Sequence, residues 1–313
     1  MEDKDWQRDD DQQRYAWQRE ERQRDHLQRE ERQRDYRQRE NQQRYVRQRD
    51  DRQREDRRRD KPQSAGKLIS ALEIPAWARC ICAVGAGGKT SLLYRLAEEY
   101  RAMGKQVLLV TTTKMYLPRE YAILDGSVRE ILEQLERDGF AVAGTTVCGG
   151  EKMGPLSGDI WRQVVPQAEI VLAEADGSRR LPLKTPGPGE PVLPEACDYL
   201  VVVEGMSAVG KPLRQVCHRA ECTAGRLNCS ADHVVTEEMA AQAAVRGYET
   251  YLEEVGKRNA QRRGEPDGSV PGGCYFLNQA DCLGEEQKEK IIREMEGNRF
   301  VLGSLKKQFR IQR

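Results

Sequence analysis

Residues 83–100 read AVGAGGKTSLLYRLAEEY, and this stretch decides the fold. An apolar run from Arg79 to Val84 leads into it, three glycines fall within the next four residues, and a helical pattern follows from Ser91 to Met103, where Gly104 stops it. Glycines at the end of a strand cost backbone entropy, so such a cluster needs a reason. A strand, a glycine-rich turn and a helix that opens on Lys-Thr are the context that a P-loop requires. The sequence therefore predicts a phosphate-binding loop.

The P-loop pattern predicts how each residue of the loop contacts a nucleotide. Backbone N–H groups of the turn and the helix N-terminus are expected to cradle phosphates. Lys89 would reach the β- and γ-phosphates and Thr90 would hold Mg²⁺, and both are expected to be exposed in the empty site. Ala83 stands where the pattern G-x4-G-K-[ST] has its first glycine, which restricts the turn a little. The residues expected to bind nucleotide here are Gly85, Gly87, Gly88, Lys89, Thr90 and Ser91; the alternative is a glycine-rich turn without a ligand.

Two carboxylates end another apolar strand, Ala168 to Gly177. P-loop proteins need a carboxylate at this place to orient the Mg²⁺ shell, and a glycine whose N–H meets the γ-phosphate, here Gly177. We expect Glu174, Asp176 and Lys89 to form the catalytic group, with Thr90, Glu174 and Asp176 at the metal. A carboxylate pair that is merely solvated is the alternative.

Two further strand ends carry polar residues. Thr113 ends the strand KQVLLVTTT at 105–113, and its hydroxyl can bond a phosphate or a Mg²⁺-bound water. The strand Gly273 to Asp281 ends in NQAD, which resembles the guanine-reading N-K-x-D motif of GTPases. Asn278 and Asp281 are therefore expected at the nucleotide, since a carboxylate accepts from guanine N1–H and N2–H₂. Gln279 replaces the lysine whose stem packs across the base, so the choice between ATP and GTP stays open.

Alternating strands and helices fill the chain from about residue 68 to 313. Continuous apolar strands between helices predict a mainly parallel sheet covered on both faces, a P-loop NTPase-like three-layer α/β sandwich. Ligands of such sheets bind at the carboxyl ends of the strands. The other expected elements are strands at 141–147 and Cys197 to Gly205, and helices at Ser127 to Arg137, with a capping box of Ser127 and Glu130, at Thr236 to Arg246 and at Glu285 to Glu296.

Residues 1–62 are expected to form a separate charged, low-complexity extension. Gln-Arg recurs every five residues from Gln13-Arg14 to Gln53-Arg54. Five residues advance a helix by roughly 140°, so no apolar side forms and no coiled-coil seam is expected. The extension is either a solvated helix or a disordered segment, and a lineage-specific addition is favoured over a weak interaction arm.

Composition narrows the functional class. The 313 residues carry a formal net charge of +1, which gives no argument for nucleic-acid or membrane binding. No run approaches the roughly 20 apolar residues of a membrane span, and the N-terminus lacks a signal-peptide core, so a cytoplasmic protein is expected. Nine cysteines are scattered. The group Cys217, His218, Cys222, Cys229 and His233 fits no paired zinc pattern, and ordinary thiols are expected.

Five motifs together resemble the YqeC family of selenium-dependent hydroxylase accessory proteins. They are VGAGGKTS at 84–91, VTTTKMY at 110–116, LAEADGSRRLPLKTPGPGEPVLP at 172–194, VGKPLRQVCHR at 209–219 and FLNQAD at 276–281. The resemblance runs from about Leu68 to the C-terminus and leaves the Gln-Arg repeat outside it. It implies a role in maturing selenium-dependent molybdenum hydroxylases, with such an enzyme as client. More distantly, the P-loop, Glu174 to Gly177 and N-x-x-D resemble metallochaperone GTPases that load nickel or cobalamin enzymes.

Two cationic segments lie within these motifs. The segment LPLKTPGPGEPVLP is too rich in proline and glycine for a helix or a central strand, so we expect a loop beside the phosphates. There Lys184 and Arg179 would neutralise phosphate charge or hold an anionic substrate, unless the loop is simply solvated. A second anion, a pterin-cofactor phosphate or a selenium oxyanion, is suggested by Lys211, Arg214, His218 and Arg219, with a purely structural His218 as the equal alternative.

These observations predict a protein that uses Mg²⁺ and binds ATP or GTP, and hydrolyses it slowly, to assist maturation of a molybdenum hydroxylase. A small-molecule kinase or nucleotidyltransferase is the first alternative, and a nucleotide-independent binding module with a degenerate P-loop is the second. An assay distinguishes the three. Slow hydrolysis without an acceptor indicates the maturation factor, turnover only with an acceptor indicates the transferase, and absence of nucleotide affinity indicates the binding module. The oligomeric state is not indicated.

Overall fold

The computed structural model describes residues 67–117 and 121–306, so the predicted extension of residues 1–62 lies outside the described residues and stays a prediction. The strands of its main sheet are β1 (Cys80–Gly85), β2 (Val107–Thr111), β3 (Met115–Tyr116), β4 (Ala122–Leu124), β5 (Phe140–Val147), β6 (Lys152–Gly154), β7 (Ile170–Glu174), β9 (Tyr199–Gly205), β11 (Gly273–Asn278) and β12 (Phe300–Leu302). The short strands β8 (Leu183–Lys184) and β10 (Cys217–His218) pair separately.

The helices alternate with these strands along the chain. They are α2 (Lys67–Ala71), α3 (Lys89–Ala102), α4 (Val128–Asp138), α5 (Gly158–Val164), α6 (Leu213–Val216), α7 (Ala220–Leu227), α8 (Glu237–Arg263) and α9 (Glu285–Glu294). None of the helices in residues 67–117 and 121–306 is both long enough and apolar enough to cross a bilayer.

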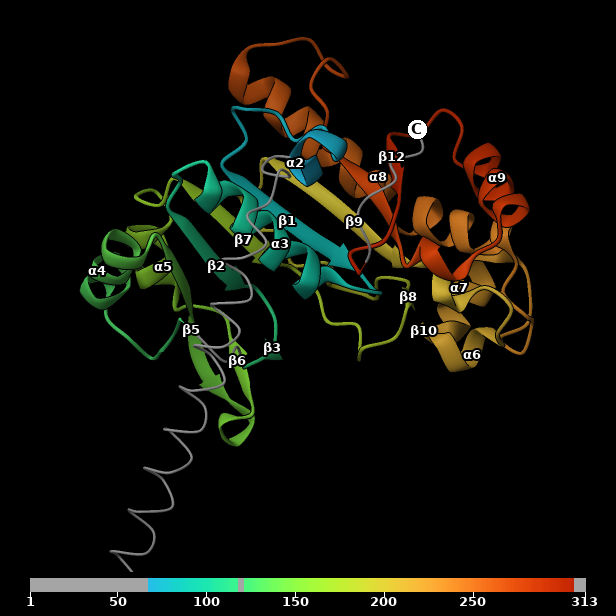
Figure 1. The fold of residues 1–313 in the computed structure, drawn as a ribbon, viewed down its shortest axis with the longest axis horizontal. Coiled ribbons are helices and arrows are strands. Elements are labelled where there is room, and N and C mark those ends of the chain that lie inside the picture. Colours follow the sequence, from blue (N-terminus) through green and yellow to red (C-terminus); the bar gives the residue numbers. More distant parts are fainter. Residues whose placement is uncertain (1–66, 118–120, 307–313) are drawn as a thin grey trace, which may run out of the picture. The chain divides into compact units, whose positions relative to one another are not determined.

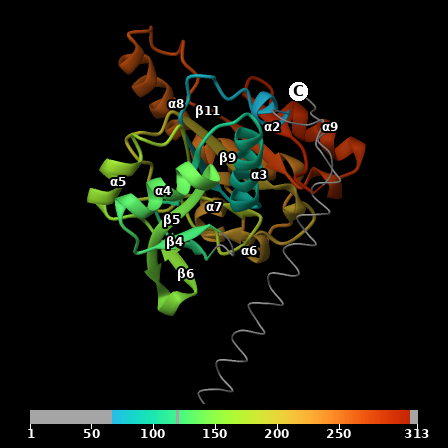
Figure 2. The same ribbon diagram turned by 60° about the vertical axis from the view of Figure 1, so that its left-hand side comes forward.

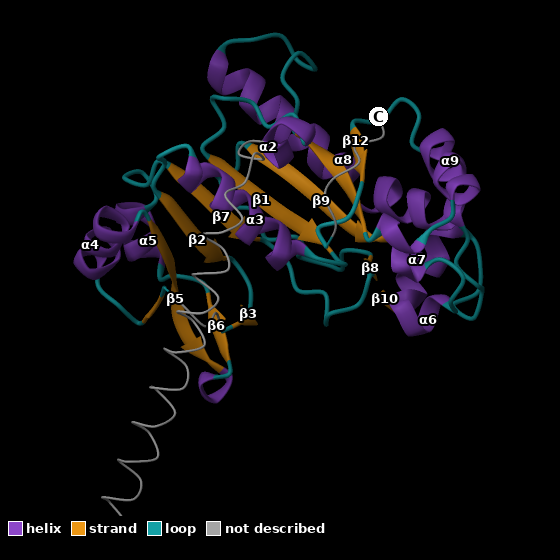
Figure 3. Cartoon of the chain, in the orientation of Figure 1, coloured by secondary structure: helices purple, strands orange, loops and turns teal. Residues whose placement is uncertain are grey.

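The main sheet has ten strands in the order β12-β11-β9-β1-β7-β2-β5-β6-β3, with β4 paired to β5 beside this path (Figures 1 and 3). The pairs from β12 to β5 and the β4–β5 pair are parallel. The pairs β5–β6 and β6–β3 are antiparallel and form an extension at one end of the sheet. The predicted α/β class with a mainly parallel sheet is confirmed.

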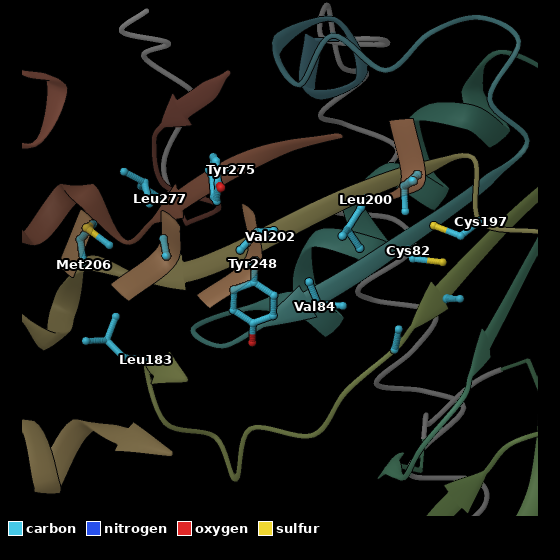
Figure 4. Packing of buried hydrophobic residues seen from close by; sticks show 14 of the residues in the cluster. Cys82, Val84, Leu183, Cys197, Leu200, Val202, Met206, Tyr248, Tyr275 and Leu277 are labelled. Carbon is cyan, nitrogen blue, oxygen red and sulfur yellow. The ribbon is translucent and has the colours of Figure 1, made fainter. Parts of the chain in front are cut away.

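Helices cover both faces of the sheet, which makes three layers. Side chains alternate along β1 as its two-residue period requires. Cys80, Cys82 and Val84 face a core that α4, α5, α8 and α9 close, shown around Tyr248 in Figure 4. Ile81 and Ala83 face a second core that α2 and α3 close. Figures 1 and 2 show α4 and α5 together near β5, and α3 beside the central strands.

Local signals set the bounds of α4 as predicted. The Glu130 N–H donates to the Ser127 hydroxyl at 3.3 Å, and the Ser127 N–H donates to the Glu130 carboxylate at 2.8 Å. This reciprocal pair is the expected capping box. Gly139 ends the helix in the left-handed conformation, at φ 65°.

Helix α8 is longer than predicted, because it continues from Arg246 to Arg263 through two glycines. Burial of Tyr248 and Val255 against the sheet outweighs the helix propensity that each glycine costs, about 1 kcal/mol. The second glycine also has a packing reason. A Cβ at Gly256 would lie 2.9 Å from the Val270 carbonyl oxygen, so only glycine lets the chain before β11 approach α8 this closely.

Candidate functional site

A cavity of about 950 Å³ opens where the central parallel strands end. The segments that follow β1, β2 and β7 line it with residues 87–91, 113–116 and 177–182. The ends of β9 and β11 add Ser207 and Gln279. This is the edge of the sheet at which parallel α/β folds bind ligands.

The glycine-rich turn after β1 is tight and internally bonded. Gly85 has φ 87°, and a Cβ there would lie 2.2 Å from the Val203 carbonyl oxygen. The N–H groups of Gly85, Ala86 and Gly87 donate to Asp176 Oδ2 at 3.0 Å, to Val203 at 2.6 Å and to Leu181 at 3.1 Å. These three amides therefore shape the loop, whereas the sequence-based expectation had them cradling phosphates.

The amides that remain for a phosphate belong to the start of α3. The Leu92 N–H donates to the Gly88 carbonyl at 2.9 Å, as the first bond of the helix. The N–H groups of residues 88–91 precede it and have no intrahelical acceptor, and these residues line the cavity. The positive end of the helix dipole adds to their attraction for an anion.

Lys89 is buried, so the expectation that it is exposed in the empty site is wrong. Its side chain is 3% exposed, and the ammonium donates to the Gly85 carbonyl at 2.7 Å and to Ser178 Oγ at 3.2 Å. Its Nζ also lies 3.2 Å from Asp176 Oδ1. A buried ammonium costs free energy unless it is paired, and here the loop carbonyl and the carboxylate satisfy it.

Thr90 and Glu174 meet beside this lysine. The Thr90 hydroxyl donates to Glu174 Oε2 at 2.6 Å. Burial raises the pKa of Glu174, and the nearby Lys89 charge opposes that rise. Hydroxyl and carboxylate oxygens are the donors that Mg²⁺ prefers, so these side chains fit the metal.

Asp176 lies behind Lys89 and is fully buried. Its Oδ2 accepts from the Gly85 N–H and from the Tyr248 hydroxyl at 3.2 Å, and lies 3.0 Å from Lys184 Nζ. The carboxylate is held between two lysines, one at each oxygen.

Lys184 does not reach the cavity, which corrects the expectation that it contacts a nucleotide or substrate. The side chain is 0% exposed and outside the lining. Its ammonium donates to the Gly177 carbonyl at 2.7 Å and pairs with Asp176 and, at 2.6 Å, with Glu190. The acids compensate its charge within the protein, because a buried cation is stable only when paired. The rest of segment 181–194 lies outside helices and the main sheet.

Of the other predicted cations, Arg219 lines the cavity but is paired. It donates two bonds to the Glu190 carboxylate, at 2.6 and 2.9 Å. The Arg219 bonds, with Lys184 adding to them, lower the pKa of Glu190 to about 2. Arg214 is exposed and pairs with Asp232, and Lys211 is exposed and donates to the Ser207 carbonyl.

The NQAD segment is split between two roles. The Asn278 amide donates to the Gly87 carbonyl at 2.7 Å and accepts from the Leu305 N–H at 3.1 Å, so it holds the glycine-rich loop. Gln279 lines the cavity, and its Oε1 accepts from the Ser207 hydroxyl at 2.5 Å. Asp281 is exposed and outside the lining.

Two lining residues present unsatisfied polar atoms. Thr113 Oγ1 and His218 Nδ1 are buried and have no hydrogen-bond partner in the described part of the chain. In the Cys217–His233 segment, Cys217 is buried and Cys222 is exposed. Across the described residues, no three His, Cys, Asp or Glu side chains assemble to hold a metal ion.

Glu204 and Tyr248 belong to this site but were not predicted. Glu204 is the next-to-last residue of β9 and is 0% exposed, and its Oε2 accepts from the Lys184 N–H at 3.1 Å. Burial raises the pKa of Glu204 well above its ordinary value, and the Asp176 charge adds to the rise. A signal for Glu204 existed, because an acid follows the apolar run VVV just as Glu174 follows VLA. Tyr248 lies inside a helix and gave no such signal.

Comparison with known sequences confirms the family resemblance over residues 81–221, which hold four of the five motifs, whereas FLNQAD at 276–281 lies beyond the match. The model of the family described as YqeC protein matches residues 81–221. An uncharacterized protein YqeC of Escherichia coli strain K12 is 35% identical over 136 residues, which are 42% of this chain and 53% of that protein. The match thus spans about half the length of this relative. The family match at 81–221 contains the glycine-rich turn, the β7 carboxylates and the two cationic segments at 181–194 and 209–219.

Two solved structures are similar at low identity. The signal recognition particle receptor FtsY from Elizabethkingia anophelis is 12% identical with a TM-score of 0.31, over 80% of this chain and 66% of that one. The hydrogenase maturation factor HypB from Archaeoglobus fulgidus is 12% identical with a TM-score of 0.30, over 77% of this chain and 88% of that one. TM-scores of this size do not establish a shared topology.

Proposed function

Because residues 81–221 match the YqeC family, we propose that this protein is a Mg²⁺-dependent nucleotide-binding maturation factor for selenium-dependent molybdenum hydroxylases. It binds ATP or GTP, hydrolyses it slowly, and acts in the cytoplasm on a client hydroxylase. One observation carries the nucleotide part: Lys89, Thr90, Glu174 and Asp176 come from two distant segments and meet at the start of α3. The family resemblance supports the maturation part.

Each of these groups has a task in this proposal. The amides of residues 88–91 and the α3 dipole bind the terminal phosphates. Lys89 exchanges part of its contact with Asp176 for phosphate oxygens, and Asp176 keeps it oriented through the pair at 3.2 Å. Thr90 and Glu174 hold Mg²⁺, which when bound offsets phosphate charge. Glu174, which lines the cavity, and the Gly177 N–H position the attacking water and the γ-phosphate, whereas buried Asp176 acts through Lys89.

Gln279 is the proposed contact to the base, since it lines the cavity at the end of β11. An amide both donates and accepts, so it suits either adenine or guanine. Transfer of a group to an anionic acceptor is the second candidate function, and the cations of the cavity favour it.

A titration of the full chain with ATP and GTP, with Mg²⁺ and again with excess chelator, tests the nucleotide part. We expect Mg²⁺-dependent binding, and slow hydrolysis without an acceptor. Thr90→Val should remove the Mg²⁺ dependence while leaving the fold, because valine matches threonine in shape. The proposal fails if neither nucleotide binds, or if Mg²⁺ has no effect on wild-type affinity.

The maturation part has its own test. A strain that lacks this protein should accumulate client hydroxylase without selenium, and the wild-type gene should restore it. The control is a Lys89→Met gene, which is expected to restore nothing. Full selenium content of the hydroxylase in the deletion strain would contradict this part alone.

A further inference from the structure

Four cations of the cavity have no acid partner among the described residues: Lys114, Lys152, Arg179 and Arg180. We call them the cationic wall. The other two lining cations are already paired, Lys89 with Asp176 and Arg219 with Glu190. The cavity therefore carries four positive charges that no acid within residues 67–117 and 121–306 pairs with.

Two cations of the wall, Lys152 and Arg180, lie against one aromatic ring, that of Tyr116. The Arg180 guanidinium carbon lies 3.8 Å from the centre of the Tyr116 ring, and Lys152 Nζ lies 5.1 Å from it. Contact with the ring face offsets part of the repulsion between two cations. Grouped like charges still cost free energy, and an anion between them would recover it.

The wall lies on the other side of the glycine-rich loop from the proposed base contact. Tyr116 belongs to β3 and Lys152 to β6, at one end of the strand order, and Lys114 follows β2, which lies between that end and β1. Gln279 follows β11, toward the opposite end, with β1 between them. A nucleotide whose base contacts Gln279 thus has its terminal phosphate toward the wall.

A formal charge count of the wall and the Mg²⁺-nucleotide leaves an excess of positive charge on the wall. A nucleoside triphosphate carries roughly four negative charges, and bound Mg²⁺ offsets two of them. Four unpaired cations exceed that remainder by about two charges, the charge of one phosphomonoester. The unsatisfied His218 Nδ1 adds a polar contact without adding charge, because burial and the neighbouring Arg219 lower the pKa of His218.

We propose that the cationic wall binds a second ligand, a small phosphomonoester dianion, beside the Mg²⁺-nucleotide. The proposal rests on the proposed function in one respect, that the nucleotide occupies the start of α3. It replaces the second-anion set expected from the sequence, Lys211, Arg214, His218 and Arg219, in which Arg214 and Arg219 are paired with acids and Lys211 is exposed outside the cavity lining.

Phenyl phosphate is a suitable probe, since it offers the dianion and a ring for Tyr116. The full chain is saturated with Mg²⁺ and a non-hydrolysable nucleotide analogue and titrated with phenyl phosphate by calorimetry. The test variant is Lys152→Gln with Arg180→Gln. The matched control is Arg129→Gln with Lys290→Gln, which removes the same charges from exposed helix positions that pair with their own helix.

We expect the test variant to bind phenyl phosphate at least about tenfold more weakly, with nucleotide affinity nearly unchanged, and the control to match wild type. Absence of phenyl phosphate binding to wild type overturns the proposal. So does a test variant that loses nucleotide affinity as strongly as phenyl phosphate affinity, because the wall would then belong to the triphosphate. Failure of any nucleotide to bind overturns the proposed function instead. In that case a titration with phenyl phosphate alone still tests whether the cationic wall binds a phosphomonoester.

Discussion

Asp176 sits between two buried lysines that can be compared directly. Lys89 Nζ lies 3.2 Å from its Oδ1 and Lys184 Nζ lies 3.0 Å from its Oδ2. Lys89 lines the cavity and Lys184 does not. Lys89→Met and Lys184→Met each remove one cation from the same carboxylate, but only the first removes a group that a phosphate can reach.

Both variants should therefore lower the free energy of unfolding, but only Lys89→Met should weaken nucleotide binding. Breaking a buried ion pair from one side costs about 3–5 kcal/mol, and Lys184→Met should lie at the upper end because it also leaves Glu190 with one cation fewer. A charge-assisted bond to phosphate contributes about 1.5–3 kcal/mol, so Lys89→Met should weaken nucleotide binding by about one to two orders of magnitude. Lys184→Met should change it little.

Denaturant unfolding gives the free energies of unfolding, and titration with Mg²⁺ and ATP or GTP on the folded variants gives the affinities. Equal nucleotide affinity in wild type and Lys89→Met would refute the phosphate role of Lys89. Equal loss of affinity in both variants would show that Asp176, rather than the lysine beside the cavity, controls binding.

Three further predictions follow from the same geometry. Gln279→Lys should raise affinity for GTP relative to ATP, since a lysine stem at this lining position packs across guanine. Asp281 is exposed, so Asp281→Ala should change the ratio of the two affinities little. A competition titration measures both ratios, and a larger change in Asp281→Ala than in Gln279→Lys would contradict the placement of the base. Arg219→Gln should lower the free energy of unfolding near neutral pH, and this loss should shrink as pH falls. The pKa of Glu190 is lowered from 4.5 to about 2, so the stabilisation by its ion pair is present above pH 4.5 and is lost as pH falls toward 2. Denaturant unfolding at several pH values tests this, and a loss that does not depend on pH would contradict it. Removing residues 1–62 should leave cooperative unfolding and nucleotide affinity unchanged, because the repeat has no apolar face to dock; non-cooperative unfolding of the truncated chain would show that the boundary is wrong.

Sequence alone was sufficient where neighbours along the chain decide the structure. The α4 capping box depends on residues three apart, and the strand–turn–helix around Gly85 depends on one contiguous stretch. Apolar runs between helices also predicted the parallel sheet, because strands buried on both faces need continuous apolar residues. The same order along the chain brought the polar strand ends to one edge of the sheet.

Only the tertiary structure decided which charges face the cavity. Lys184 and Lys114 read alike in the sequence, but one is buried against Asp176 and Glu190 and the other lines the cavity without an acid partner among the described residues. Tyr248 lies 72 residues from the carboxylate that it contacts, and Tyr116 lies 64 from Arg180. Burial and pairing of a charge depend on such distant contacts, because the free energy of a buried ion is set by what surrounds it in space.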